Sequence, residues 1–260
     1  MDSRKKYHYL LKIQYLGFRF HGWAKQPGLK TIHQMLDKTF EFILGENQYK
    51  SIGSSRTDAK VSANESLVHL QTVNELNDNF LDLLNLNLPP DIRALEINDF
   101  PENFNIIQSP KSKEYLYLFS FGAKPHPFST SFLVNIAENL DIDLMKKGAK
   151  IFEGEHNFLS YCTKPSPSVN PVRMITLCEI VDNDFFRASF FPKKSYALRI
   201  CSKGFMRNQV RLIMAQLFNL GKGEIELEDI RESLKNPSLG SMKSIAPASG
   251  LVLNRIDLET

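Results

Sequence analysis

The sequence predicts an α+β protein made of two units of similar make-up, and three observations lead to that prediction. Residues 7–15 (YHYLLKIQY) are aromatic and β-branched enough for a strand, and residues 114–122 (EYLYLFSFG) alternate strongly. From Thr31 to Gly45, apolar side chains recur at helical spacing behind a capping-box pattern formed by Thr31 and Gln34. The strand, helix, strand, strand order of the first half is typical of a mixed sheet with a helix on one face.

The remaining elements are placed by alternation, by apolar stripes and by the Pro and Gly residues that end them. In the first half we expect strands at 51–53, 67–73 and 91–99 and a helix at about 78–86. In the second half we expect helices at 143–153 and about 226–234, and strands at 173–181, 196–202 and within 246–258. A long helix is expected between the strand at 196–202 and the helix at about 226–234. Its apolar stripe is made of Met206, Val210, Ile213, Met214 and Leu217.

Length and composition fit an ordinary globular protein. At 260 residues with 42% hydrophobic content, the chain can form one large domain or two modest ones. The polar, proline-containing residues 105–112 indicate the boundary, which gives an N-terminal domain at 1–108 and a C-terminal domain at 109–260. The N-terminus lacks the apolar run of a signal peptide, and no stretch approaches the roughly 20 apolar residues of a membrane span. We therefore expect a cytoplasmic protein that does not bind a membrane.

Charge is distributed unevenly along the chain. The net charge of +3 is too small to indicate a nucleic-acid binder by itself. From Phe185 to Gly223, however, there is no Asp or Glu, whereas Lys and Arg recur throughout. Such a segment favours contact with a phosphate backbone. The alternative is a solvated face that is balanced by acids from elsewhere in the fold.

Residues 53–63 (GSSRTDAKVSA) concentrate small and polar side chains around one carboxylate, Asp58. Arg56 lies two positions before it. A nearby cation keeps a carboxylate ionised, as a nucleophile or base requires. Taken alone, the pattern is more often a structural ion pair, so both interpretations stay open on these residues.

The other residues do not indicate a metal site or a nucleotide-binding site. The histidines lie on different elements without metal-ligand spacing, so we expect isolated structural roles for them. The sequence contains no glycine-rich phosphate loop of either common type, which argues against nucleotide hydrolysis and a dinucleotide cofactor.

The Asp58 segment resembles the signature of the TruA family of tRNA pseudouridine synthases, an Arg-Thr-Asp-Ala-Gly-Val-His-Ala loop; residues 56–63 here are RTDAKVSA. The likeness runs in family order from about residue 7 to residue 258. The other segments that carry it are IQYLGFRFHGWAKQ, TIHQMLDKTF, LNLPPDIRALEI, KEYLYLFSFG, GEHNFLSYCT, GFMRNQVRLIMAQLFNLGKG and APASGLVL.

The resemblance implies a fold, a reaction and an assembly. It implies the pseudouridine synthase fold: two similar α/β sandwich domains with mixed or antiparallel sheets and a catalytic cleft between them. It implies conversion of tRNA uridines to pseudouridine in the anticodon arm, at positions 38–40 in tRNA numbering. Because this isomerisation consumes nothing, no metal and no cofactor is expected. The family works as a homodimer, so the implied partners are tRNA and a second copy of the chain.

The resemblance also implies roles for five residues. Asp58 matches the catalytic carboxylate, and Arg56 matches the loop arginine that helps to extrude the nucleotide. Tyr115 matches the tyrosine against the target base, where an aromatic ring replaces the base stacking that is lost on extrusion. Arg211 matches the arginine that pairs with the catalytic Asp, and Leu251 matches an apolar residue that borders the base pocket.

Four positions depart from the family pattern: Lys60 and Ser55 stand for glycines, Ser62 for the histidine, and Leu16 for an acid. Lys60 could add a phosphate contact. It could equally replace a glycine whose backbone geometry matters. Two alternatives remain for the function: a noncatalytic RNA-binding or RNA-folding protein on the same scaffold, or a pseudouridine synthase that acts on another RNA or position.

Overall fold

The computed structural model describes residues 6–102, 104–165, 170–238, 240 and 242–258. The chain divides into two compact units, Met1–Lys111 with Leu253–Thr260, and Ser112–Val252. The boundary expected from the sequence, between residues 108 and 109, differs from this division in two ways. The division falls three residues later, and the last residues of the chain belong to the first unit rather than to the second.

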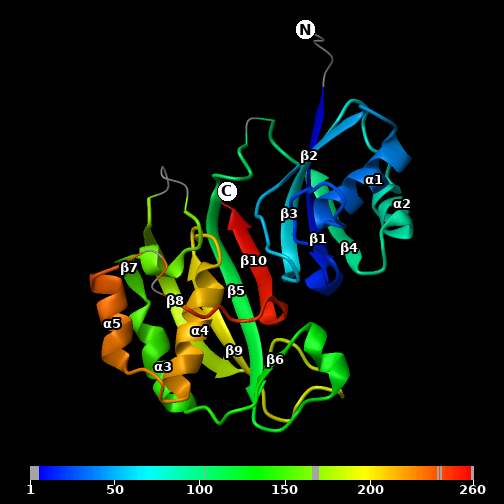
Figure 1. Cartoon of the computed structure of the whole chain (residues 1–260). Coiled ribbons are helices and arrows are strands. Elements are labelled where there is room, and N and C mark those ends of the chain that lie inside the picture. Colours follow the sequence, from blue (N-terminus) through cyan, green and yellow to red (C-terminus); the bar gives the residue numbers. More distant parts are fainter. Residues whose placement is uncertain (1–5, 103, 166–169, 239, 241, 259–260) are drawn as a thin grey trace. The chain divides into compact units, whose positions relative to one another are not determined.

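The first unit is a sheet with two helices, shown in Figure 1. Its strand order is β4-β1-β3-β10, and β2 also pairs with β3. The β1–β3, β1–β4 and β2–β3 pairs are antiparallel. Its elements are β1 (Tyr7–Tyr15), a 3-10 turn (Gly17–Arg19), α1 (Ile32–Leu44), β2 (Tyr49–Gly53), β3 (Ser62–Thr72), α2 (Phe80–Asn87), β4 (Ile92–Asp99) and β10 (Leu251–Leu258), whose first two residues belong to the second unit.

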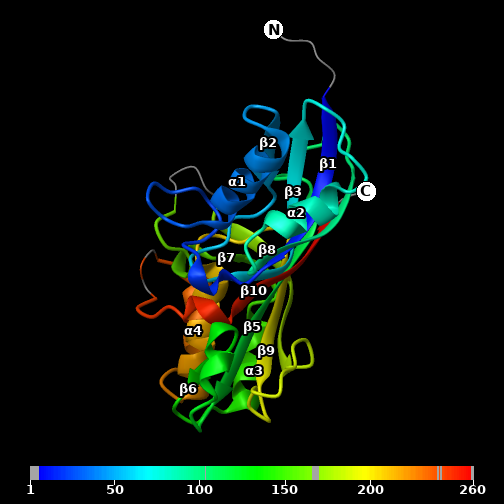
Figure 2. The ribbon, with the colours of Figure 1, turned by 90° about the vertical axis from the view of Figure 1, so that its right-hand side faces the viewer.

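The two helices of the first unit contact each other, and α1 contacts β2 while α2 contacts β4. Figure 2 shows them beside the strands from a second direction. The predicted start and end of α1 are confirmed, because the Thr31 hydroxyl accepts a hydrogen bond from the Gln34 amide and Gly45 ends the helix with φ 93°.

The strand β3 begins at Ser62, five residues before the expected start at residue 67. The sequence of its first residues, SANES, lacks the apolar alternation of a strand. They extend because they pair with β1, with Ala63 opposite Tyr15 and Ser66 opposite Ile13. The strand therefore starts directly after the loop that carries Asp58.

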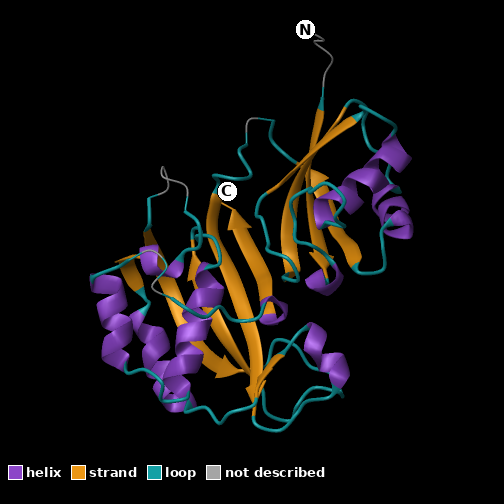
Figure 3. Ribbon diagram, in the orientation of Figure 1, coloured by secondary structure: helices purple, strands orange, loops and turns teal. Residues whose placement is uncertain are grey.

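The second unit is a mixed sheet with three helices. Its strand order is β5-β9-β8-β7, with antiparallel pairs, and β6 lies parallel to β5. Figure 3 shows α3, α4 and α5 gathered on one face of this sheet. Its elements are β5 (Pro110–Phe121), β6 (Val134–Ile136), α3 (Ile142–Ile151), β7 (Gly154–Asn157), β8 (Val172–Asp182), β9 (Tyr196–Ser202), α4 (Gln209–Gly221) and α5 (Leu227–Lys235), with 3-10 turns at Pro127–Ser131, Leu159–Tyr161 and Ala248–Gly250.

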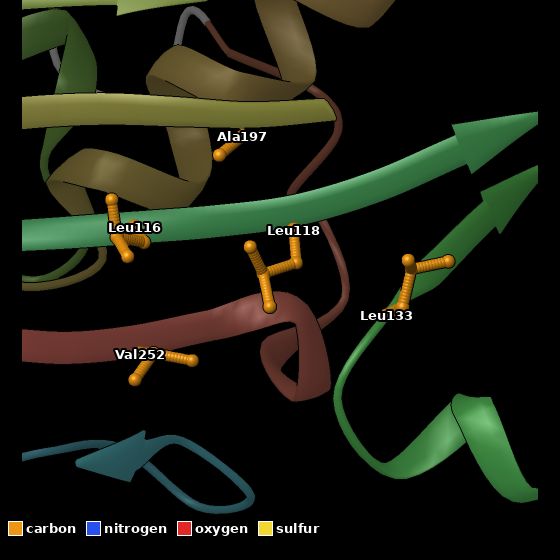
Figure 4. Close-up of a cluster of buried hydrophobic side chains, with 5 residues drawn as sticks. All are labelled: Leu116, Leu118, Leu133, Ala197 and Val252. Atoms are coloured by element: carbon orange, nitrogen blue, oxygen red, sulfur yellow. The ribbon is translucent and has the colours of Figure 1, made fainter. Parts of the chain in front are cut away.

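Both faces of β5 are covered. The rings of Tyr117 and Phe119 each contact the ring of Phe218 on α4. On the other face, alternate residues of β5 join a cluster of buried side chains, Leu116, Leu118, Leu133, Ala197 and Val252, shown in Figure 4. The strand predicted at 114–122 is thus confirmed, and side chains on both of its faces are packed in the core of this unit.

Two expectations about the second unit need correction. Met206 lies before α4, because Asn208 adopts a left-handed backbone with φ 61° and the helix begins only at Gln209. The positive charge of residues 185–223 is also partly neutralised. Arg187 pairs with Asp184, Arg199 pairs with Glu114 and Glu179, and Lys222 pairs with Glu138 and Glu224.

None of the helices in the described part of the chain has the length and apolarity needed to cross a membrane.

Candidate active site

The loop between β2 and β3 places Asp58 at a defined position in the first unit. Asp58 is half-buried and Arg56 is exposed, whereas Thr57 between them is buried. The Thr57 hydroxyl lies 2.8 Å from the Tyr15 hydroxyl, and its carbonyl accepts a hydrogen bond of 3.0 Å from the Trp23 amide. The residue before the carboxylate is therefore held through both its side chain and its backbone.

A tight turn follows Asp58. The Asp58 carbonyl accepts a hydrogen bond from the Val61 amide at 3.2 Å, and the Lys60 amide donates to the Phe20 carbonyl at 3.1 Å. Ser62, which replaces the family histidine, is buried, and its hydroxyl accepts a hydrogen bond of 2.9 Å from the Gly17 amide. The loop is therefore tied on both sides of Asp58 to the segment that follows β1.

Three glycines permit this close approach. A Cβ at Gly17 would overlap the Val61 carbonyl, and one at Gly53 would overlap the ring of Trp23. Gly22 has φ +91°, and a Cβ there would lie 2.8 Å from the Thr57 carbonyl oxygen. Trp23 is buried and stacks on His33 at 5.5 Å between ring centroids. Gly17, Gly22 and Trp23 lie in the segment IQYLGFRFHGWAKQ, which carries the family resemblance, but none of them was assigned an individual role from the sequence.

The sequence left open whether Lys60 replaces a glycine whose backbone geometry matters. The φ of Lys60 is 68°, which lies in the left-handed region. The glycine of the family pattern is thus replaced at a position where the backbone itself favours glycine. Its ammonium lies 5.9 Å from the centroid of the Phe18 ring.

We expect Lys60→Gly to stabilise the protein by up to about 1 kcal/mol, since removing the Cβ relieves left-handed strain at some cost in chain entropy. Lys60→Ala is the matched control, because it removes the same charge and keeps the Cβ. The measurement is the urea unfolding midpoint of the three proteins. A glycine variant that is less stable than the alanine variant would contradict the interpretation.

In the second unit, Tyr115 lies on β5 and is 8% exposed. Its ring meets the ring of Phe205 edge-on, at 5.3 Å between centroids. Lys113 is two residues earlier, so strand alternation gives it the same face as Tyr115. Burial lowers the pKa of Lys113. Neither Lys113 nor Phe205 was singled out in the sequence, although alternation along 113–117 was a usable signal for the first.

Arg211 is held in a fixed orientation on α4. Its Nε donates to the Ala246 carbonyl at 2.8 Å and its Nη1 donates to the Asn208 side chain at 3.1 Å, while the Ala246 amide donates to the Arg211 carbonyl. The neighbouring Pro247 carbonyl accepts a hydrogen bond from the Tyr117 hydroxyl at 2.8 Å. Burial raises the pKa of Tyr117, although Arg211 acts in the opposite direction, so this phenol stays protonated and can donate.

The same segment leads to Leu251, which is 6% exposed at the start of β10. The second unit thus brings Arg211, Tyr117 and residues 246–247 together, with Leu251 four residues further along. Of the five residues singled out from the sequence, Arg56 and Asp58 belong to the first unit, and Tyr115, Arg211 and Leu251 belong to the second.

Comparison with known proteins places the chain in a family. The family model described as tRNA pseudouridine synthase matches residues 149–257. A protein of Mycoplasma genitalium named tRNA pseudouridine synthase A is 32% identical over 253 residues, which cover 96% of this chain and 98% of the relative. Proteins of the same name from a Bacillus species and from Dictyoglomus thermophilum are 32% and 30% identical, each over 95% of this chain and 98% of the relative. Because these similarities extend over nearly the whole length of both chains, the protein belongs to the tRNA pseudouridine synthase A family.

Proposed function

We propose that this protein converts uridines of tRNA to pseudouridine and that Asp58 is the catalytic carboxylate. The observation that carries the proposal is similarity to tRNA pseudouridine synthases A over the full length of the chain. The held position of the loop around Asp58 supports the choice of residue, since catalysis requires a reacting group in a defined geometry.

Pseudouridine formation requires one carboxylate and a surface that holds the detached base. The N-glycosidic bond of uridine breaks, uracil rotates, and a new bond forms between C5 of the base and C1′ of the ribose, while C5 loses its proton and N1 takes one up. Asp58 would begin this sequence either by attack on the nucleotide or by removal of a proton from its sugar. The isomerisation is balanced without any further reactant.

The remaining residues of the proposal bind the substrate. Arg56 is exposed two residues before Asp58, and we assign it to the phosphate or base of the extruded nucleotide. Tyr115 provides an aromatic face, and Leu251 an apolar border for the base. Arg211 supplies a positive charge whose orientation is fixed by its hydrogen bonds to Ala246 and Asn208.

Tyr115 is expected to act through its ring. Tyr115→Ala should lower the rate at subsaturating tRNA by roughly 5- to 150-fold, because stacking of a base on an aromatic side chain contributes about 1–3 kcal/mol. Tyr115→Phe keeps the stacking surface and should lose far less. Single-turnover kinetics of both variants, with circular dichroism to verify folding, measure the difference. Equal losses in the two variants would assign the effect to the hydroxyl and contradict a stacking role.

The reaction itself is tested by tritium release from tRNA that carries [5-³H]uridine, because pseudouridine formation frees the C5 hydrogen. Release is expected with the purified protein and tRNA. A protein that binds tRNA and releases no tritium would be a noncatalytic RNA binder. Mapping of pseudouridine in cellular RNA, with and without the protein, then tests the proposed positions 38–40 against other positions and other RNAs.

We further propose that the protein works in the cytoplasm and as a homodimer. A tRNA is far larger than one nucleotide pocket and is recognised mainly through its shape and backbone, which two copies contact better than one. Light scattering during size-exclusion chromatography, at the concentrations used for activity, tests the dimer.

A further inference from the structure

A cavity in the first unit lies outside the residues assigned above. It has a volume of about 290 Å³ and is lined by His8, Lys50, Ile52, His69, Gln71 and Glu102. Five of these residues lie on β1, β2 and β3, where Gln71 is opposite both His8 and Lys50, and His69 is opposite Ile52. Cross-strand partners project from the same face of a sheet. Ser51, of opposite parity, hydrogen-bonds Asp37 on α1, so the cavity lies on the face turned away from α1.

The two histidines form a hydrogen-bonded pair. His8 Nδ1 lies 3.0 Å from His69 Nε2, and the other nitrogen of His8 lies 3.5 Å from the Gln71 amide nitrogen. The expectation that these histidines are isolated is therefore wrong. In the pair, one ring donates and the other accepts, so only one of them can be protonated without breaking the bond. Burial, then the nearby His8 and Lys50, lower the pKa of His69, which favours the neutral form of His69 at pH 7.

The groups facing the cavity favour an anion. Lys50 brings a fixed positive charge, the His8 and His69 pair can take up one proton, and Gln71 adds an amide donor. Glu102, from the segment after β4, is the one acid among the lining residues. Although two histidines and a glutamate line the cavity, the described residues contain no group of three or more His, Cys, Asp or Glu side chains that could hold a metal ion.

We propose that this cavity binds a phosphoryl group. A phosphate offers acceptor oxygens to the Lys50 ammonium, the Gln71 amide and an imidazole N–H, and its charge stabilises a proton on the histidine pair. The volume equals that of about ten water molecules in the liquid, which suits a phosphate with part of its hydration shell or its ribose. The source is a phosphate of bound tRNA or a free phosphoryl compound, and the tRNA source rests on the proposed function.

The first arm of the test uses inorganic phosphate and needs no catalysis. Phosphate is titrated into the full-length protein while the ring resonances of the histidines are followed by NMR. Resonances of His8 and His69 should shift together and saturate in the millimolar range, with tighter binding at pH 6 than at pH 8. Lys50→Gln should weaken binding by about tenfold, and Glu102→Gln, which removes the opposing charge, should strengthen it by roughly threefold.

The second arm uses tRNA, with dissociation constants measured over a range of salt concentrations. If the phosphate belongs to tRNA, Lys50→Gln should weaken binding by roughly fivefold near physiological salt and reduce the slope of log K against log salt by about one. Lys38→Gln, an exposed lysine on α1, is the control for general loss of charge and should bind as the wild type does.

The two arms separate the outcomes. Phosphate binding with an unchanged tRNA constant would support a site for a free phosphoryl compound. Unshifted histidine resonances together with an unchanged tRNA constant for Lys50→Gln would overturn the proposal. A wild-type protein that binds phosphate and forms no pseudouridine would contradict the proposed function and leave the cavity assignment standing.

Discussion

Replacing Asp58 with Asn is expected to lower the rate of pseudouridine formation at least about a thousandfold, because the amide can neither attack the nucleotide nor accept a proton from its sugar. The change preserves shape, and the loop is anchored through the Thr57 hydroxyl and carbonyl, the Lys60 amide and the Ser62 hydroxyl. Unfolding midpoint and tRNA affinity should therefore stay close to those of the wild type. Tritium release under single-turnover conditions measures the rate.

Two further variants make this result specific. Asp58→Ala should be equally inactive, which excludes an effect peculiar to the amide. Asp78→Asn removes one exposed carboxylate from the same unit outside the loop and should leave the rate unchanged. If Asp58→Asn restored full modification of tRNA, the carboxylate would have no chemical role, whatever the fold.

The elements with strong periodicity were predictable from the sequence. The strand β1 has the predicted bounds, and α1 begins and ends at its predicted caps, because alternation and capping are local signals. The early start of β3 was not predictable in this way, since its polar residues are extended by their pairing with β1. The start of α4 at Gln209 was likewise not predictable, because the spacing of apolar residues does not reveal the left-handed backbone of Asn208.

The site residues divide in the same manner. Asp58 and Arg211 were proposed as site residues because their segments resemble a family, whereas the groups that hold them depend on long-range contacts. Tyr15 meets Thr57 across 42 positions of the chain, and Arg211 meets Ala246 across 35. The pairing of His8 with His69 spans 61 positions and follows from the register of β1 against β3, which spacing along the sequence does not reveal.

The second large effect is expected at Gly17, which lies beside the loop of Asp58 without contributing a side chain. Gly17→Ala should destabilise the protein by about 3 kcal/mol, because the added methyl group would overlap the Val61 carbonyl, a backbone atom that cannot rotate away as a side chain does. The displacement would also stretch the bond from the Gly17 amide to Ser62, so activity should fall with stability.

Gly204→Ala is the matched control for Gly17→Ala, since a Cβ at Gly204 meets nothing within 4 Å and its backbone is not left-handed. It should unfold at the wild-type urea concentration. Because Gly17 also lacks a positive φ, a loss of stability there cannot come from backbone strain and must come from the close approach of the two loops. An unfolding midpoint for Gly17→Ala equal to that of Gly204→Ala would mean that the segment after β1 does not fix the Asp58 loop, and the positioning of the carboxylate would need another cause.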